Sequence, residues 1–349
     1  PQPFALMDGK QEVPYQLDDL NGDGQPDEAF ALVNFRPTEK KEGSTLTLTV
    51  QAVASSEVEA KTQAFLLRQP HTYDPDSVKK LTGDYQRIQE YDVPDNLKPQ
   101  GYWLKFEGPS WENDVVGYRV YMDTRNRYDI FGKQVSDLVM DTVALDYHKI
   151  NPWGADILKV GNSLGIGSPA LLVGDSLMAF ENYAAKRFEL VTSGPLRSIF
   201  RIHFTQLAFG DDRMDLMVEH EMHAGHRWTE IRIHVLKTTI KNPTFATGLV
   251  KHPAAPDFEV EQYKNQHIGY TYGAQSFHDE VLGMAIIVPD NQDVQAVPGG
   301  LLDSHVFTFS AVNGVASYRF LAAWEREPGA LTDEAAFAKH LRAEATAWE

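Results

Sequence analysis

The sequence lacks cysteine entirely, since none occurs among its 349 residues. Disulfide bonds, thiolate metal sites and cysteine nucleophiles are therefore excluded. No apolar run approaches the roughly 18 residues that a membrane-spanning helix requires. The first residues, PQPFALMDGK, lack the charged and apolar regions of a signal peptide. We expect a mature chain that has no membrane partner.

Positive charge is also scarce. The chain has 32 lysines and arginines against 49 aspartates and glutamates, which gives a formal net charge of −17 at pH 7. A surface of this sign repels phosphate, so we expect no nucleic-acid partner. An anionic ligand would have to meet a local cluster of basic residues. Hydrophobic residues make up 42% of the chain, which is enough to bury a substantial core.

The dominant pattern is alternation of apolar and polar residues with period two, which is typical of half-buried strands. It recurs in VVGYRVYM, LRSIFRIHF, WTEIRIHVL, GMAIIVP, HVFTFSAV and ASYRFLAAW. One clear helix is predicted at 332–348, with Thr332 as N-cap and Phe337 and Leu341 on its apolar stripe. A shorter helix is expected within 75–91. The sequence predicts a single all-β domain over 1–349, a large antiparallel β-sandwich with few peripheral helices.

Two neighbouring strands, MDLMVEHEMH and RWTEIRIHVL, suggest a hairpin with a two-residue turn at 224–225. That turn would place Val218 opposite Ile231 on the core side and Glu219 opposite Glu230 on the other side. Facing carboxylates are destabilising unless something neutralises them. They are either an acid and base pair for sugar chemistry or part of a solvated face relieved by nearby basic residues.

The segment LDDLNGDGQPDE carries oxygen-bearing side chains at alternate positions of a short loop, residues 19–28. Calcium prefers roughly six to eight hard oxygen ligands, and a glycine within such a loop permits its sharp bend. A helical EF-hand would have glutamate at the twelfth position, which is Phe30 here, so we expect the loop to lead into a strand. The alternative is an unliganded turn rich in Asp and Asn. The predicted ligands of a structural Ca²⁺ are Asp19, Asn21, Asp23, the carbonyl of Gln25, and Asp27.

A predicted strand at 117–125 carries Arg119, Tyr121, Asp123 and Arg125 on one face. Basic residues outnumber acidic ones between 117 and 133, so this segment forms a local positive island in an acidic chain. Arginines of this kind suit a carboxylated sugar, and nearby tryptophans offer flat surfaces for its ring. The alternative is an Arg/Asp ladder on a solvent face, with the tryptophans in the core.

Four segments together resemble the DUF4861 family of bacterial secreted or periplasmic proteins. They are VPYQLDDLNGDGQPDE, GPSWENDVVGYRVYMDTRNRYDIFGK, DYHKINPWGADILKVGNSLGIGS and YTYGAQS. The resemblance implies a galactose-mutarotase-like supersandwich and a carbohydrate-active enzyme that acts beside uronate-polysaccharide-degrading enzymes. It suggests a dehydratase of ulvan-type oligosaccharides. A periplasmic or secreted location also fits an exposed calcium loop, because calcium is abundant there.

Our hypothesis is therefore a carbon–oxygen lyase whose partner is a uronate-containing oligosaccharide. Removal of the C5 proton creates negative charge that a cation must stabilise, and loss of the C4 substituent then gives an unsaturated uronate. Arg119 and Arg125 are assigned to the carboxylate, and His148 with Tyr147 or Tyr121 to proton transfer. The predicted substrate contacts are Trp153, Tyr272, Gln275, Asp123 and Trp111. The alternatives are a glycoside hydrolase or epimerase using Glu219 and Glu230, and a non-catalytic carbohydrate-binding protein.

Overall fold

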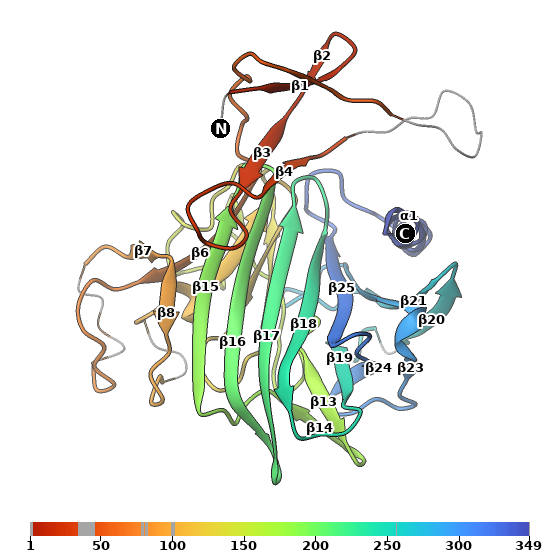
Figure 1. The fold of residues 1–349 in the computed structure, drawn as a ribbon. Coiled ribbons are helices and arrows are strands. Elements are labelled where there is room, and N and C mark those ends of the chain that lie inside the picture. Colours follow the sequence, from red (N-terminus) through yellow and green to blue (C-terminus); the bar gives the residue numbers. More distant parts are fainter. Residues whose placement is uncertain are drawn as a thin grey trace.

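Strands account for most of the regular structure in a computed structural model of the chain, which describes residues 3–33, 46–77, 80, 83–98, 102–255 and 257–348. The predicted all-β sandwich is confirmed. Its first layer is a curved antiparallel sheet that faces the viewer in Figure 1. The nine described strands of this large sheet are, in spatial order, β20 (Glu259–Tyr263), β21 (Gln266–Gly273), β22 (Leu282–Pro289), β25 (Val315–Trp324), β18 (Trp228–Thr238), β17 (Asp212–His223), β16 (Arg197–Phe209), β15 (Ala185–Ser193) and β8 (Glu90–Asp92).

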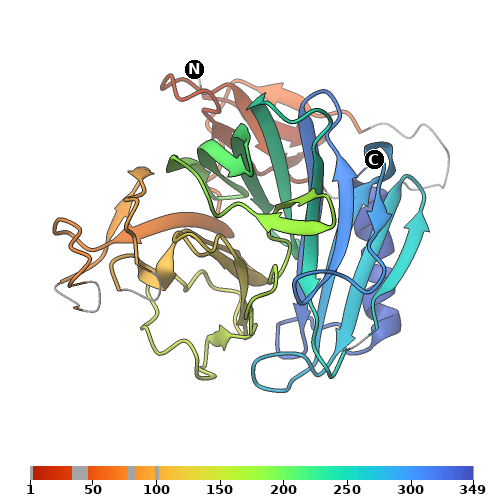
Figure 2. The same ribbon diagram turned by 90° about the horizontal axis from the view of Figure 1, so that it is seen from below.

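Two smaller sheets together form the second layer, as the view in Figure 2 shows. The six-stranded sheet runs β12 (Gly154–Asp156), β11 (Tyr128–Lys133), β10 (Val116–Val120), β9 (Ser110–Asn113), β6 (Thr62–Arg68) and β7 (Gln86–Ile88) among the described residues. The five-stranded sheet runs, on the same basis, β14 (Ser176–Ala179), β13 (Ala170–Val173), β19 (Thr244–Val250), β24 (Ser304–Ser310) and β23 (Gln295–Ala296).

The main core lies between these layers, because period-two alternation gives each sheet one apolar face. Val218 and Ile233 of the large sheet, Tyr118 of β10 and Phe245 of β19 belong to one buried cluster. Trp111, on β9, is 1% exposed within it and donates its indole N–H to the Thr229 hydroxyl at 2.8 Å. The tryptophan is thus a core residue with its one polar atom satisfied.

The predicted register of the β17–β18 hairpin is wrong by two residues. Glu219 pairs with Arg232, and Glu221 is the residue that faces Glu230. The connection is longer than the predicted two-residue turn, since Met222 and Thr229 form the last pair before it. A shift of two leaves every side chain on its predicted face, so the core face is still correct.

The helix α1 (Glu334–Ala347) covers the opposite face of the large sheet near its β21–β22 edge (Figure 1). Its N-cap is Asp333 rather than the predicted Thr332, because the Asp333 carboxylate accepts a hydrogen bond from the Ala336 N–H at 2.7 Å. Phe337 and Leu341 pack against outward-facing residues of β22 and β25 such as Leu321. This explains why the second half of β25, from Phe320 to Trp324, is apolar on both faces.

The predicted helix within 75–91 is wrong where the structure describes that stretch. Residues 86–88 and 90–92 are the strands β7 and β8, which pair with β6 and β15. Residues 78–79 and 81–82 lie outside the described residues. The other described helical segments are two short 3₁₀ turns, Lys105–Glu107 and Asp290–Gln292. No described helix has the length and apolar character needed to cross a membrane.

Smaller N-terminal strands sit above the large sheet in Figure 1. Their described bounds are β1 (Ala5–Asp8), β2 (Gln11–Val13), β3 (Tyr15–Asp18), β4 (Glu28–Ala31) and β5 (Thr49–Gln51). The β3–β4 hairpin is anchored by Arg197 of β16, which is ion-paired with the buried Asp18 and, at 2.6 Å, with Glu28. The loop 19–27 is therefore held over the large sheet.

We expect Phe337→Ala to lower the free energy of unfolding by about 3 kcal/mol, since it empties the contact between α1 and the sheet. Phe337 is fully buried and fits against Gly283, where a Cβ would lie 2.8 Å from its ring. Urea denaturation measures the change. Lys339→Ala, an exposed position on the same helix, is the control and should stay within about 0.5 kcal/mol of the native chain. A loss below about 1 kcal/mol for Phe337→Ala would contradict this packing.

Candidate functional site

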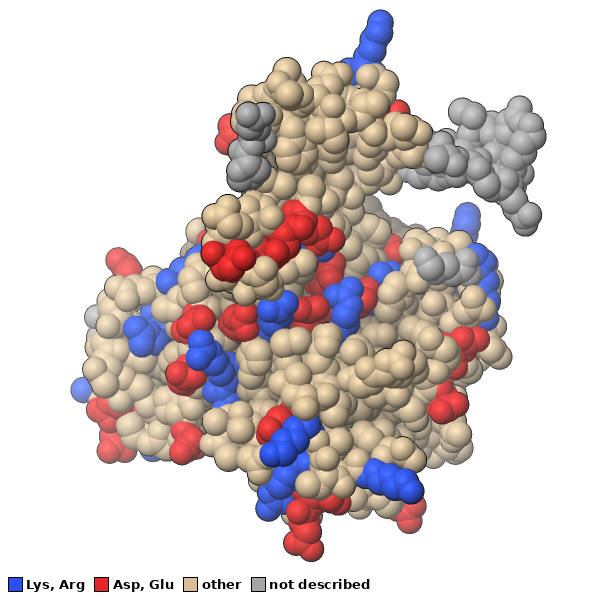
Figure 3. Space-filling model, viewed as in Figure 1, with Lys and Arg blue, Asp and Glu red and all other residues tan. Residues whose placement is uncertain are grey.

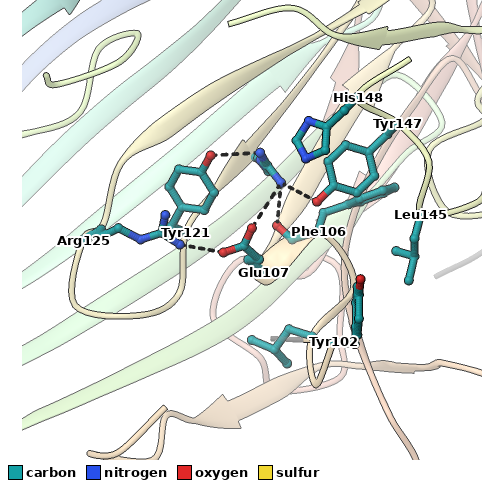
Figure 4. Close-up of a pocket in the computed structure, with 10 residues that line it drawn as sticks. Tyr102, Phe106, Glu107, Tyr121, Arg125, Leu145, Tyr147 and His148 are labelled. Carbon is teal, nitrogen blue, oxygen red and sulfur yellow. Dashed lines mark hydrogen bonds and ion pairs between the residues drawn. The ribbon is translucent and has the colours of Figure 1, made fainter. Parts of the chain in front are cut away.

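A cavity of about 430 Å³ lies on the face of the six-stranded sheet that points away from the main core. Its walls come from the sheet, from residues 102–107 and from residues 145–148. All five predicted catalytic residues line it. Figure 4 labels Tyr121, Arg125, Tyr147 and His148 among them. The lining residues are Tyr102, Leu104, Phe106, Glu107, Arg119, Tyr121, Arg125, Leu145, Tyr147 and His148.

Arg119 lies at the base of the cavity and is surrounded by acceptors. It is 1% exposed, and its Nη2 contacts carboxylate oxygens of Asp129 at 2.6 Å and Asp156 at 2.9 Å. Nη2 also donates to the Tyr121 hydroxyl at 2.9 Å, and Nη1 donates to the Tyr147 hydroxyl at 3.2 Å. Asp129 comes from the β11 position paired with Arg119. With its donors engaged in this way, Arg119 organises the site and is unsuited to capture a substrate carboxylate.

Arg125 is more accessible than Arg119, since its side chain is 34% exposed. Asp123 accepts from its Nε at 2.9 Å, and Glu107 accepts from its Nη2 at 2.6 Å. Its guanidinium also stacks over the Tyr121 ring, 4.0 Å from the ring centroid. Nη1 has no hydrogen-bond partner among the described residues, so it keeps its donors for a ligand.

The predicted positive island is wrong, because every base of that segment has acidic or carbonyl partners. Arg119 and Arg125 are paired as above, Arg127 contacts Glu181 at 2.7 Å, and the fully buried Lys133 contacts Glu112 at 2.6 Å. Several of these acids come from outside residues 117–133. The cavity therefore combines fixed charges of both signs.

His148 and Tyr147 form the wall opposite Arg125, and their rings lie 4.5 Å apart. The imidazole side chain is 60% exposed, and its Nδ1 lies 3.3 Å from a carboxylate oxygen of Asp156. The same oxygen contacts Arg119. One buried carboxylate thus connects the arginine at the base to the histidine at the rim.

These contacts shift the pKa values of the side chains in the site. The hydrogen bond to Asp156 raises the pKa of His148 above its ordinary value, although burial opposes the change. Burial raises the pKa of Tyr147, and Arg119 partly offsets this effect. Burial and the Asp129 carboxylate raise the pKa of Tyr121 strongly. Both phenols are therefore protonated at neutral pH.

Lys186 holds the turn that carries Asp123 and Arg125. It is a buried residue of β15, and its Nζ donates to the carbonyls of Met122 at 2.6 Å and Asp123 at 2.8 Å and to Oδ1 of Asn126 at 2.9 Å. These three bonds use all the donors of an ammonium group. Burial lowers the pKa of Lys186 to about 7. Sequence analysis missed this residue, because no local pattern relates position 186 to positions 122–126.

The other predicted substrate contacts lie outside the cavity lining. Trp111 and Gln275 are 1% exposed, and the Gln275 amide donates to the Leu282 carbonyl at 2.7 Å. Tyr272 packs against Phe337 of α1, on the far side of the large sheet. Trp153 stacks near Phe131 beside the cavity. Asp123 is 3% exposed, and its carboxylate holds Arg125, which does line the cavity. The structure therefore does not bring Trp111, Gln275 and Tyr272 into this cavity.

Glu219 and Glu230, the carboxylates of the alternative enzyme, lie on the outer face of the large sheet, where acidic and basic side chains are mixed (Figure 3). Glu219 contacts Arg201 at 2.9 Å, and Glu230 contacts Arg319 at 2.8 Å. Arg232 bridges both glutamates. Each carboxylate is neutralised, as expected for the structural interpretation of this face.

The oxygen-rich loop closes through hydrogen bonds of its own. The Asp19 carboxylate accepts from the Gly22 N–H at 2.8 Å and the Gly24 N–H at 2.7 Å, and Asp27 accepts from the Leu20 N–H at 2.8 Å and the Asn21 side chain at 2.7 Å. Gly24 has φ of 84°, which favours glycine. No three His, Asp or Glu side chains of the described residues form a ready metal site, so an ion here would also need amide and carbonyl oxygens.

The fold and the cavity define a β-sandwich protein with an aromatic, ion-paired pocket. The chain belongs to the DUF4861 family, described as a domain of unknown function, whose model matches residues 1–349. This confirms the family resemblance. No curated protein matches the chain significantly.

We expect Lys186→Met to loosen the turn at 122–126, because it leaves two carbonyls and the Asn126 side chain without their shared donor. Hydrogen exchange followed by mass spectrometry should show at least tenfold faster exchange in peptides covering that turn. Lys237→Met, an exposed position on β18, is the matched control. Unchanged exchange in the turn would show that Lys186 does not hold it.

Proposed function

We propose that the protein is an oligosaccharide dehydratase, a carbon–oxygen lyase that removes water from a terminal uronate to give an unsaturated uronate. The observation that carries this proposal is the placement of the His148 imidazole and the Tyr147 phenol in one cavity with Arg125. An imidazole and a phenol supply the base and the acid that such an elimination needs. Arg125 supplies a reachable positive charge for the substrate carboxylate.

His148 is the proposed base. Its Nδ1 faces Asp156, which favours the tautomer that carries a proton on Nδ1 and leaves Nε2 free to accept one. Nε2 takes the proton from C5 of the uronate, and the C5–H electron pair becomes the C4–C5 double bond. The acceptor role requires neutral imidazole, while the Asp156 carboxylate stabilises the imidazolium that forms.

Tyr147 is the proposed acid. Its phenol donates a proton to the hydroxyl at C4 as the C4–O bond breaks, so the departing group leaves as water. The resulting phenolate lies beside Nη1 of Arg119, and this buried guanidinium stabilises the negative charge. The proton that His148 gained returns to solvent and Tyr147 regains one, which restores the resting state.

A chain end is the proposed target, in preference to internal cleavage. The volume of about 430 Å³ lies at the lower end of the range of about 300–1,000 Å³ for small-molecule sites, which suits a short sugar unit. The substrate carboxylate would approach Nη1 of Arg125, because Nε and Nη2 are engaged by Asp123 and Glu107. Ulvan fragments are one proposed source of such ends.

The proposed setting is the bacterial periplasm or the extracellular space. A structural Ca²⁺ in loop 19–28 is part of this proposal, because its aspartate, amide and carbonyl oxygens are the hard donors that calcium prefers. The ion would hold the loop between β3 and β4 and has no role in the elimination.

We expect His148→Ala and Tyr147→Phe each to lower kcat by about 100-fold or more on oligosaccharides ending in glucuronate. Ultraviolet absorbance of the conjugated double bond and product mass measure the reaction. His267→Ala and Tyr263→Phe, on the distant β20–β21 hairpin, are matched controls and should keep native activity. Chain shortening with unsaturation would indicate a lyase, and products without a double bond would overturn the proposal.

The pH dependence gives a second test of the same site. Because the base must be neutral and Asp156 raises the pKa of His148 above its ordinary 6.5, kcat/KM should rise with pH through an acidic limb located above that value. Asp156→Asn removes the main cause of the shift, so its limb should move to lower pH. A limb that stays in place would exclude His148 as the titrating base.

Calcium should bind to the native chain and raise its midpoint of thermal unfolding, since an ion bound only by the folded state stabilises it. Isothermal titration calorimetry after treatment with a chelator measures the binding. Asp23→Ala should abolish it, whereas Asp76→Ala, another exposed aspartate, should not. Equal calcium binding by both variants would refute the loop as the site.

A further inference from the structure

A second cavity, of about 520 Å³, lies where β19 ends and β24 begins. None of its described lining residues is acidic, although acidic residues greatly outnumber basic ones in the whole chain. The lining residues are Lys251, His252, Pro253, Phe258, Gly299 and His305. Three of these side chains can donate a hydrogen bond to an anion.

His305 provides a fixed nitrogen atom without a partner. The residue is 8% exposed, and its ring stacks on Phe258 with centroids 4.8 Å apart and planes 14° apart. Its Nε2 is buried and has no hydrogen-bond partner among the described residues. A buried polar atom of this kind is costly unless a ligand or solvent satisfies it.

Lys251 brings positive charge to the same place. Its ammonium donates to the Gly299 carbonyl, and it uses one of three donors in doing so. Burial, together with the charge of Lys251, lowers the pKa of His305. An anion bound between the two would relieve both effects, because it satisfies the imidazole and balances the ammonium.

His252 contributes a hydrogen-bond donor, and the contact of one ring nitrogen shows which of the two nitrogens carries the proton. Its Nδ1 accepts a hydrogen bond from the Ala254 N–H at 3.2 Å. The proton of the neutral ring is then on Nε2, which makes this atom a donor to a ligand. Two imidazoles and one ammonium thus line the cavity.

The glycine pair at 299–300 keeps one wall free of side chains. Gly299 has φ of 73° and Gly300 has φ of 64°. A Cβ at Gly300 would lie 2.0 Å from the Ser304 carbonyl oxygen and 3.0 Å from Nζ of Lys251. Only glycine fits at position 300. Gly299 lines the cavity, and a Cβ there would meet nothing within 4 Å, so the wall at Gly299 is bare backbone.

We propose that this cavity binds an oxyanion, a sulfate or carboxylate group, between Lys251 and His305. Three features favour this class of ligand. They are the donors of Lys251 and His252, the unpartnered buried nitrogen of His305, and the absence of acids from the described lining. Acidic sugars carry such groups, and so does free inorganic sulfate. The site is independent of the proposed dehydration, because none of its residues lines the first cavity.

Binding by the native chain tests the proposal without any activity assay. Calorimetric titrations with sodium sulfate and with glucuronate, each against sodium chloride at the same ionic strength, separate the two sources of the oxyanion. Lys251→Met keeps the aliphatic stem, and His305→Phe keeps the stacking on Phe258. Lys241→Met, an exposed lysine elsewhere, is the matched control. The His305 ring signal in a proton–carbon NMR spectrum reports local contact.

We expect saturable binding of at least one oxyanion, a shifted His305 signal, and at least tenfold weaker binding in Lys251→Met and His305→Phe but not in Lys241→Met. Binding of sulfate alone would support a site for the free ion, and binding of glucuronate would support an acidic sugar. No binding of either anion to the native chain overturns the proposal. Binding that survives both substitutions overturns it as well, provided that thermal unfolding shows folded variants.

Discussion

The ion cluster around Arg119 is the constraint on which the candidate site depends. A guanidinium that is almost completely buried must be surrounded by acceptors, and Asp129 and Asp156 supply the charge that balances it. Those bonds fix two phenols and, through Asp156, one imidazole. Removal of Arg119 would leave two buried carboxylates without their shared partner, which typically costs about 3–5 kcal/mol. The geometry of the candidate site and the stability of the six-stranded sheet therefore have the same origin.

Local alternation in the sequence was sufficient to predict the fold class and the faces of the strands. It was also sufficient to bring Arg119, Tyr121 and Arg125 to one side, because parity along one strand needs no knowledge of the rest of the chain. The hairpin register required the length of a turn that the sequence does not reveal. The error of two residues kept the face and changed the partner, so Glu219 faces Arg232 instead of Glu230.

Long-range partners explain where the structure places residues differently from the sequence-based expectation. Basic residues outnumber acidic ones within segment 117–133, but Glu107, Asp156 and Glu181 reach it from other segments. Tryptophan is a residue type that suits a sugar ring, but the Trp111 side chain belongs to the main core. Whether a side chain meets solvent depends on the sheet or helix that covers it, as α1 does for Tyr272.

Lys186 connects the two layers of the sandwich, since it starts on β15 of the large sheet and ends on the turn that carries Arg125. The position of that arginine is thus set by the spacing between the layers. A core substitution far from the cavity that separates the sheets slightly would displace the guanidinium with them. Packing in the middle of the sandwich and recognition at its edge are, on this view, mechanically coupled, and interior residues share in determining which ligands fit.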